Sequence, residues 1–285
     1  MSKLKKNIVW LVSYPKSGNT WIRVILENLF SEKMDPVDIN QLELTHIASS
    51  REIFDRYSGT NSSDLSKNEV LNLRPHVYRN LSKSTNEKLF IKAHDAWQLT
   101  LEEEELFPKE ITHGVLYLIR NPLDIAVSYS FHNSISIDES IKRINSQSNT
   151  LASAQTKIFS QLEQNLFSWS GHVRSWTERS NHRLHLIKYE DLISNTLQAI
   201  AKALTFLDIE YDSKSLTHAV NNSSFQHLQK LEREAGFREK PQTNSQFFRD
   251  GKSNNWESFL NKENIESIIS EQGTMMKKFG YLSNK

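Results

Sequence analysis

Two observations predict an α/β fold with a central parallel sheet flanked by helices. Short apolar runs rich in β-branched and aromatic residues recur at 7–14, 88–94, 114–121 and 184–191. Their hydrophobicity is continuous rather than alternating, which is typical of strands covered on both faces. Segments of helical period lie between these runs, and strand followed by helix, repeated, indicates an α/β architecture.

The helical segments place apolar residues at steps of three and four. We expect helices within 21–30, directly after the first strand, within 158–176 and within 197–207. Two stretches lack this pattern: 136–156 is rich in Ser, Asn and Gln, and 221–256 has little apolar periodicity. Long irregular segments in compact domains are often lids or binding loops, so we expect irregular structure there.

Composition limits the class of protein. The chain has 285 residues and no recognisable linker, which predicts a single domain over 1–285. A net charge of +1 gives no global attraction for nucleic acid or an anionic membrane, and the lack of cysteine excludes disulfides and cysteine-ligated metals. The apolar stretch at 8–12 is too short for a signal sequence or a membrane span. We expect a cytoplasmic chain with neither a nucleic-acid nor a membrane partner, and leave its oligomeric state open.

The octet YPKSGNTW (14–21) lies between the first predicted strand and helix. Open α/β sheets bind ligands at the carboxyl ends of strands, and a helix N-terminus favours an anion. Lys16 adds a charge, Ser17 and Thr20 add hydroxyl groups, and Gly18 permits close backbone approach. The usual ATP loop has its lysine after the second glycine, whereas here lysine precedes the only glycine. An ordinary turn has the same composition, so the octet alone leaves both interpretations open.

Five segments in order give the sequence a family resemblance. The octet resembles the 5′-phosphosulfate loop of sulfotransferases that use 3′-phosphoadenosine 5′-phosphosulfate (PAPS). The other matching segments are LIRNPLDIAVSYSFH (118–132), KAH (92–94), KYEDL (188–192), and SSF (223–225) with FFRDG (247–251). The resemblance implies a P-loop-like nucleotide-binding sulfotransferase fold and a cytosolic-type, small-molecule enzyme.

The resemblance also implies roles for individual residues. The 5′-phosphosulfate is expected to contact Lys16, Ser17, Gly18, Asn19 and Thr20. Trp21 and Tyr189 would flank the adenine, and the 3′-phosphate would be held by Arg120, Ser128, Arg249 and Gly251. Ser223, Phe225, Phe247 and Phe248 belong to the late segments expected to close over the nucleotide. Asp250 departs from the family pattern, because a basic residue is usual at its position.

The chemistry implied is sulfuryl transfer without a metal, with adenosine 3′,5′-bisphosphate (PAP) as product. A basic side chain must then neutralise the leaving group, and Lys16 is the candidate. His94 is the candidate general base, because histidine titrates near neutrality. Lys92 is expected to steady the sulfuryl oxygens.

The acceptor is less defined by the sequence. Residues 40–80 and 133–157 are expected to frame its pocket, which suits a small polar or cationic molecule with a hydroxyl or amine. The candidate lining residues are Tyr78, Asp95, Trp97, Phe131, His132 and Phe237. Two alternatives stay open: a P-loop kinase-like phosphotransferase, and a non-catalytic nucleotide-binding module.

Overall fold

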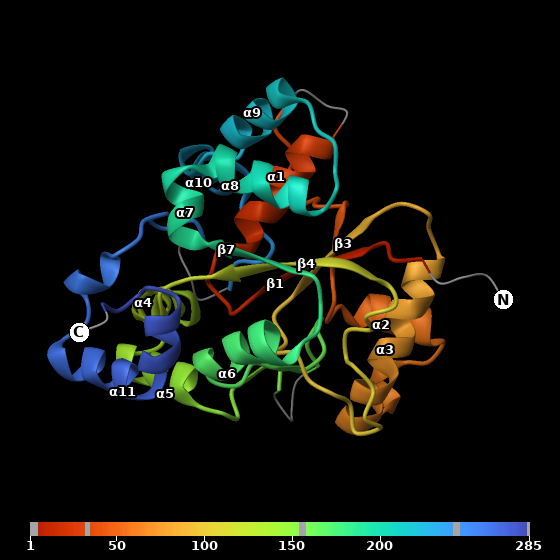
Figure 1. Ribbon diagram of the computed structural model, residues 1–285, viewed down its shortest axis with the longest axis horizontal. Helices are drawn as coiled ribbons and strands as arrows, with labels where there is room; N and C mark the ends of the chain where they lie inside the picture. Colours follow the sequence, from red (N-terminus) through yellow and green to blue (C-terminus); the bar gives the residue numbers. More distant parts are fainter. Residues whose placement is uncertain (1–4, 32–34, 154–157, 242–245, 284–285) are drawn as a thin grey trace. The chain divides into compact units, whose positions relative to one another are not determined.

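The computed structural model describes residues 5–31, 35–153, 158–241 and 246–283 (Figure 1). The chain divides into two compact units, each assembled from three segments. Unit 1 contains the chain up to Tyr14, His46–Tyr117 and Gln147–His185. Unit 2 contains Pro15–Thr45, Leu118–Ser146 and the chain from Leu186 onward. The single domain predicted over 1–285 stays a prediction.

The main sheet has five strands in the order β2-β3-β1-β4-β7. The strands are β1 (Ile8–Ser13), β2 (Thr45–Ile47), β3 (Leu89–Ala93), β4 (Thr112–Ile119) and β7 (Leu184–Lys188). β1 and β3 run parallel with Val12 opposite Ala93, so both end at the same edge. The predicted α/β fold and the four predicted strands are confirmed. β2 was not predicted, because three residues are too few to show a pattern.

The burial of the strands explains why the sequence pattern predicted them. Every residue of β1 and β3 is buried, and so is nearly all of β4. Strands without a solvent face have no alternation, which is the pattern found in the sequence. β7 differs, because Ile187 is its one buried residue.

Unit 1 adds helices and a small hairpin to the sheet. They are α2 (Arg51–Ser58), the 3-10 helix Ser62–Asp64, α3 (Lys67–Lys83), β5 (Thr150–Leu151), β6 (Gln164–Asn165), α6 (Trp169–Arg174) and the π-helical turn Ser175–Arg179. α2 packs against α3 (Figure 1). Trp10, Tyr78, Phe107 and Trp176 form an aromatic core, with the Trp10 and Phe107 ring centroids 4.9 Å apart.

The helix expected over 158–176 is wrong before Trp169. Leu162 N donates to Ser49 O at 2.7 Å, and β6 pairs with β5. The backbone amides there are therefore hydrogen-bonded to other segments and not within a helix. Phe167 has a φ of +58°, which ends any right-handed helix. Leu162 and Leu166 are buried although neither lies in a helix, and their four-residue spacing resembles that of a helix.

Unit 2 is mainly helical. Its helices are α1 (Asn19–Phe30), α4 (Pro122–Asn133), α5 (Ile137–Asn145), α7 (Tyr189–Ser194), α8 (Thr196–Phe206), α9 (Ser213–Asn222), α10 (Phe225–Ala235), the 3-10 helix Asn255–Ser258 and α11 (Lys262–Lys278). In Figure 1, α1 packs against α9, whereas α4 and α5 pack against α11. The helices expected within 21–30 and 197–207 are confirmed.

Two segments predicted as irregular contain helices. α5 lies within 136–156, where Ser136 caps it and Ile141 and Ile144 are buried. α10 lies within 221–256 and buries Leu228 together with the carboxylate of Glu232, a polar residue that hides the apolar period. Residues 154–156 and 242–245, which belong to the same predicted segments, lie outside the described residues. None of the helices in the described ranges is long and apolar enough to cross a bilayer.

Candidate active site

The loop that follows β1 enters unit 2 at Pro15 and carries the predicted phosphate-binding octet. Gly18, the N-cap of α1, has a φ of +95°, in the region that favours glycine. A Cβ atom at this position would lie 2.9 Å from the Tyr189 ring, so the close approach of loop and ring requires glycine. Asn19 and Thr20 are buried at the start of α1, which begins without a side-chain cap. A helix start of this kind favours an anion.

Buried polar atoms in this region fit a phosphate-bearing ligand. Within the described part of the chain, Ser17 Oγ and Arg120 Nε are buried and have no hydrogen-bond partner. A buried polar atom without a partner costs free energy. Both groups are donors, and the oxygens of a phosphate or phosphosulfate would supply the acceptors.

Lys16 has an uncommon backbone conformation. Its φ is +70°, which is rare for a residue other than glycine and often marks a functional loop. Its Nζ lies 4.4 Å from the centroid of the Phe247 ring, a cation–π contact. The side chain predicted to stabilise the leaving group is therefore held against the segment predicted to close over the nucleotide.

Arg120 joins three of the predicted segments. It is 8% exposed. Its Nη1 donates to Lys16 O and its Nη2 to Lys252 O, each at 3.0 Å. Its Cζ lies 4.1 Å from the centroid of the Tyr189 ring. Burial raises the pKa of Tyr189, although the positive charge of Arg120 opposes this shift. We define the late loop as residues 246–256. One guanidinium thus connects the octet, the predicted adenine residue Tyr189 and the late loop.

Asp124 holds the late loop from the first turn of α4, a role that the sequence did not reveal. Its carboxylate is 1% exposed. It accepts hydrogen bonds from Asn254 N at 2.9 Å and Trp256 N at 3.2 Å. A carboxylate near a helix N-terminus is also stabilised by the helix dipole. The signal available was the spacing of Arg120 and Asp124 in one segment, which places both at the same strand-to-helix junction.

α10 holds the other end of the late loop. The Glu232 carboxylate accepts hydrogen bonds from the backbone amides of Phe247 and Phe248, at 2.6 and 2.9 Å. Gln229 Nε2 donates to the carbonyls of Phe248 and Arg249, each at 2.9 Å. Glu232 and Gln229 were also missed, because their partners are backbone groups that leave no mark on the sequence.

Arg249 and Asp250 lie at the surface of the late loop. The Arg249 guanidinium lies 4.0 Å from the Phe131 ring centroid and 5.5 Å from that of Phe259. Partial burial lowers the pKa of Arg249, and the charge of Arg120 lowers it further. Asp250 opposes that shift, since its carboxylate lies 3.5 Å from Arg249 Nη2. Asp250 therefore partly neutralises an arginine predicted to bind the 3′-phosphate.

The remaining nucleotide candidates also lie in unit 2. Trp21 Nε1 donates to Ser223 O at 2.8 Å, and the Trp21 and Tyr189 ring centroids are 6.4 Å apart. Gly251 has a φ of +60°, and a Cβ there would lie 2.5 Å from the Phe225 ring. Ser128 is half-buried on α4. Its predicted contact with the 3′-phosphate stays a prediction.

Unit 1 contains the two remaining catalytic candidates at the end of β3. Lys92 is 7% exposed and lies opposite Leu11 in the sheet. His94 Nδ1 lies 2.8 Å from Ser13 O, its nearer partner, and 3.2 Å from Ser13 Oγ. A carbonyl oxygen can only accept, so Nδ1 carries the hydrogen and the lone pair of the neutral ring is on Nε2. This tautomer suits a general base that works through Nε2.

Three of the predicted acceptor-lining residues belong to cores. Tyr78 and Asp95 are 1% and 0% exposed. The Tyr78 hydroxyl donates to Ala48 O at 3.0 Å, and both oxygens of Asp95 accept from Arg74 at 2.8 and 2.7 Å. Phe237 is packed in the hydrophobic core of unit 2. These contacts favour a structural role over the predicted lining role. A polar residue at the end of a strand does not show, from the sequence alone, that it has a buried partner.

Trp97, Phe131 and His132 are more accessible. Trp97 is half-buried in unit 1, and Phe131 is 40% exposed in unit 2. The ring centroid of His132 lies 5.5 Å from that of Phe247. Their acceptor-side role stays a prediction.

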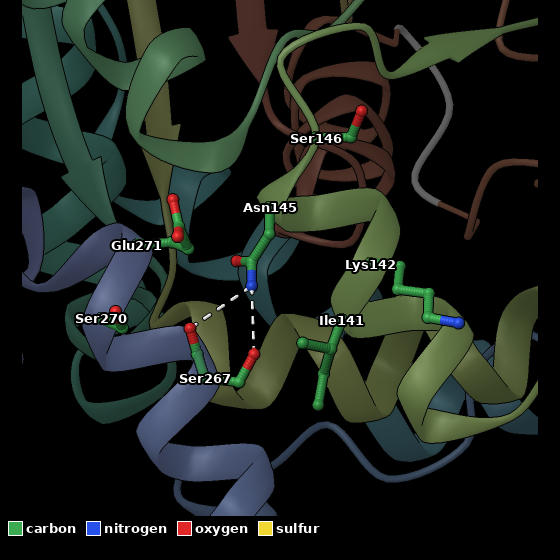
Figure 2. A pocket seen from close by; sticks show the side chains of 7 residues that line it. All are labelled: Ile141, Lys142, Asn145, Ser146, Ser267, Ser270 and Glu271. Carbon is green, nitrogen blue, oxygen red and sulfur yellow. Dashed lines mark hydrogen bonds between the residues drawn. The ribbon is translucent and has the colours of Figure 1, made fainter.

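A polar groove of about 460 Å³ lies between α5 and α11 in unit 2. Figure 2 shows Asn145 pointing toward Ser267, with hydrogen bonds of 3.4 and 3.5 Å. Four of its lining residues, Ile141, Lys142, Asn145 and Ser146, belong to the range 133–157 that was expected to frame the acceptor pocket, but none of the individually named nucleotide or acceptor candidates lines it. It is separate from the residues assembled around Arg120.

Comparison with known proteins identifies the family. Residues 6–280 match the family model described as the sulfotransferase domain. Sulfotransferase 1B1 of Mus musculus is 27% identical over 224 residues, which cover 76% of this chain and 64% of the mouse protein. Sulfotransferase 2A1 of Macaca fascicularis is 27% identical over 274 residues, covering 93% and 82%. The chain thus spans less than two thirds of the first relative's length.

Solved structures share the fold. Mouse sulfotransferase SULT7A1 complexed with PAP has a TM-score of 0.59 at 15% identity, covering 97% of this chain and 89% of the other. Retinol dehydratase in a complex with retinol and PAP has a TM-score of 0.62 at 17% identity, covering 96% and 82%. The predicted sulfotransferase fold is confirmed, and the phosphotransferase and non-catalytic alternatives are not favoured. Because the family match extends over nearly the whole chain, the protein belongs to the sulfotransferase family.

Proposed function

We propose that this chain transfers the sulfuryl group of PAPS to a hydroxyl or amine of a small molecule and releases PAP. The observation that carries the proposal is the position of Arg120, which contacts the octet, the late loop and Tyr189. Four segments far apart in sequence are joined by one buried cation, where the family binds a nucleotide with several phosphates. Among the described residues Arg120 forms no ion pair, although its charge acts on the nearby Glu190 carboxyl and opposes the rise of its pKa. A buried cation without a carboxylate in direct contact favours an anionic ligand.

The proposed reaction forms one bond to sulfur and breaks another. The acceptor oxygen or nitrogen attacks sulfur, and the bond between sulfur and the bridging oxygen of PAPS breaks. We assign Lys16 as the donor to that oxygen, which gains negative charge as it leaves. His94 Nε2 takes the acceptor's proton, in agreement with the tautomer fixed by Ser13 O. Lys92 is assigned to the sulfuryl oxygens.

The acceptor proposed is small. The retinol and androsterone named for two solved retinol dehydratase structures support a small organic acceptor. The aromatic Trp97 and Phe131 suit such a molecule, and the chain's net charge of +1 offers no attraction for an anionic polysaccharide. We also propose that the protein acts in the cytoplasm. The lack of cysteine in the chain is compatible with this compartment.

Transfer of radiolabelled sulfate from PAPS to a panel of alcohols, phenols, amines and guanidinium compounds tests the reaction. Activity is expected to persist in EDTA, and strict dependence on Mg²⁺ with ATP as donor would instead support a phosphotransferase. Lys16→Ala is expected to lower kcat by roughly 10²–10³-fold, the effect of removing one donor to a developing negative charge. His94→Ala should abolish transfer while PAP still binds. Full activity in both variants would contradict the assigned roles.

A further inference from the structure

His172 is a completely buried histidine that the motifs of the sequence do not include. It lies on α6 in unit 1 and is 0% exposed. Its Nδ1 lies 2.8 Å from the Tyr117 hydroxyl oxygen, and its Nε2 lies 3.0 Å from the backbone oxygen of His94. Both ring nitrogens therefore have partners, and one partner belongs to the candidate general base.

The directions of these two hydrogen bonds can be assigned. Burial lowers the pKa of His172 to about 4, so the ring is neutral at pH 7. The His94 carbonyl can only accept, which places the ring hydrogen on Nε2. Nδ1 then accepts, and the Tyr117 hydroxyl donates to it. Each bond has a single direction, which fixes the tautomer of His172.

The segment that begins with His94 is held at successive residues. His172 binds the carbonyl of His94, Trp176 Nε1 donates to Asp95 O at 3.0 Å, and Ala96 N donates to Asn165 O at 2.8 Å. The ring of His94 is held separately through Ser13 O. The backbone and the ring of His94 are thus each fixed by a directed hydrogen bond.

His172 also contacts the first residue of the octet. The Tyr14 and His172 ring centroids are 5.5 Å apart, with an interplanar angle of 85°. The Tyr14 hydroxyl accepts a hydrogen bond from Asn149 Nδ2 at 2.8 Å. The same imidazole therefore packs against the first residue of the octet and binds the carbonyl of the residue proposed as base.

We propose that His172 is a positioning residue for sulfuryl transfer: it holds the backbone carbonyl of His94 and so fixes the orientation of the His94 imidazole. The inference rests on the proposed function, in which His94 takes the acceptor's proton. A base displaced by about 1 Å can lose up to roughly 10²-fold in rate. Loss of the His172 bond should therefore lower kcat more than it raises KM.

Two substitutions separate the hydrogen bond from the packing. In His172→Gln the side-chain amide reaches as far as the imidazole Nε2 and keeps a donor for His94 O. In His172→Asn the amide is one methylene shorter and cannot reach this oxygen. His182→Asn is the matched control, because His182 is also buried, with Nε2 3.0 Å from the carbonyl of Phe107 and its pKa also lowered to about 4.

Steady-state kinetics with PAPS give the first readout, well below the melting temperature of each variant. We expect His172→Asn to lower kcat about tenfold with KM changed less than about twofold. His172→Gln should recover most of the rate, and His182→Asn should keep the wild-type kcat. If His172→Asn and His182→Asn have the same kcat, the positioning role is overturned. If His172→Asn does not fold, His172→Met replaces it, because this side chain fills a similar volume without a donor for His94 O, and an unchanged kcat there has the same meaning.

Nitrogen NMR of histidine-labelled protein without nucleotide gives a second readout that does not depend on activity. The wild-type His94 ring should show its hydrogen on Nδ1, and His172→Asn should give a mixture of tautomers. An unchanged His94 ring in His172→Asn overturns the inference, even if the protein transfers sulfate. An inactive wild-type protein whose His94 ring changes as expected would contradict the proposed function and support the positioning role.

Discussion

Two buried arginines, Arg74 in unit 1 and Arg120 in unit 2, have opposite surroundings. Arg74 is 1% exposed and binds both oxygens of Asp95, while its Nε donates to the Tyr78 hydroxyl at 2.9 Å. Arg120 is 8% exposed and binds two neutral carbonyls and an aromatic ring. Among the described residues no carboxylate lies within salt-bridge distance of Arg120. A buried charge that is already neutralised supports the fold, whereas one that is not indicates where an anion binds.

The largest expected effect comes from breaking the neutralised pair. Arg74→Leu would leave Asp95 buried without its cation, and removing one partner of a buried pair costs about 3–5 kcal/mol of unfolding free energy. Urea denaturation measures this loss. The double variant Arg74→Leu/Asp95→Leu is the control, and it should regain part of the stability because no buried charge remains. A single variant within about 1 kcal/mol of wild type would contradict the structural role of this pair.

The pH dependence of stability should come from the buried histidines of unit 1. The pKa of His172 is about 4 in the folded protein, against 6.5 as its ordinary value. Its neutral form therefore stabilises the fold above pH 6.5, and that contribution falls as the pH decreases from 6.5 to about 4. The shift corresponds to about 3 kcal/mol. Denaturation curves from pH 7.5 to 4 measure it.

His172→Gln is the control for this pH dependence, since its amide does not titrate. The variant should show a smaller loss of unfolding free energy between pH 6.5 and 4. His182 shares the lowered pKa of about 4 and should account for part of the remaining slope. Equal slopes in wild type and His172→Gln would mean that His172 is not buried as a neutral ring.

Replacing Arg120 should affect ligand binding more than folding. Arg120→Leu removes two hydrogen bonds to neutral carbonyls, and each contributes about 1 kcal/mol to stability. A charged donor to a phosphate contributes about 1.5–3 kcal/mol, so affinity for PAP should fall roughly tenfold to a hundredfold. Isothermal titration should show little change for AMP, which lacks the 3′-phosphate. An equal loss for PAP and AMP would contradict the assignment of Arg120 to the 3′-phosphate.

The two arginines also show what the sequence could predict. Arg120 follows a buried strand within a recognisable segment, so the sequence predicts its position at a strand-to-helix junction. Asp95 follows a strand in the same way, but its partner Arg74 lies on α3, and no local pattern joins the two. The sequence therefore suggested an acceptor contact for Asp95 where the structure has a core ion pair. A polar residue at a strand end has the same sequence signal in either role.

The parts of the site that the sequence missed are held by the backbone. Asp124 and Glu232 accept hydrogen bonds from amides of the late loop, and every residue except proline offers such an amide. Glu232 also hid α10, because its buried carboxylate occupies a position where a periodic helix would have an apolar residue. Long-range pairing to main-chain atoms is visible only in the folded chain.

The smallest expected effect concerns Asp250, which brings a negative charge to the arginine side of unit 2. Its carboxylate lies 3.5 Å from Arg249 Nη2, and both side chains are about one third exposed, at 37% and 30%. Exposed pairs of this kind are worth about 0.2–1 kcal/mol, so Asp250→Asn should tighten PAP binding by up to roughly fivefold, because Arg249 is then free to meet the 3′-phosphate. Titration calorimetry at low and high salt measures the gain, which should shrink as salt screens it. Glu52→Gln on α2 is the matched control, because it removes the same charge from an exposed side chain of unit 1. Weaker binding in Asp250→Asn would show instead that this carboxylate helps to hold the late loop in the conformation that binds PAP. The departure from the family pattern at this position would then stabilise the late loop.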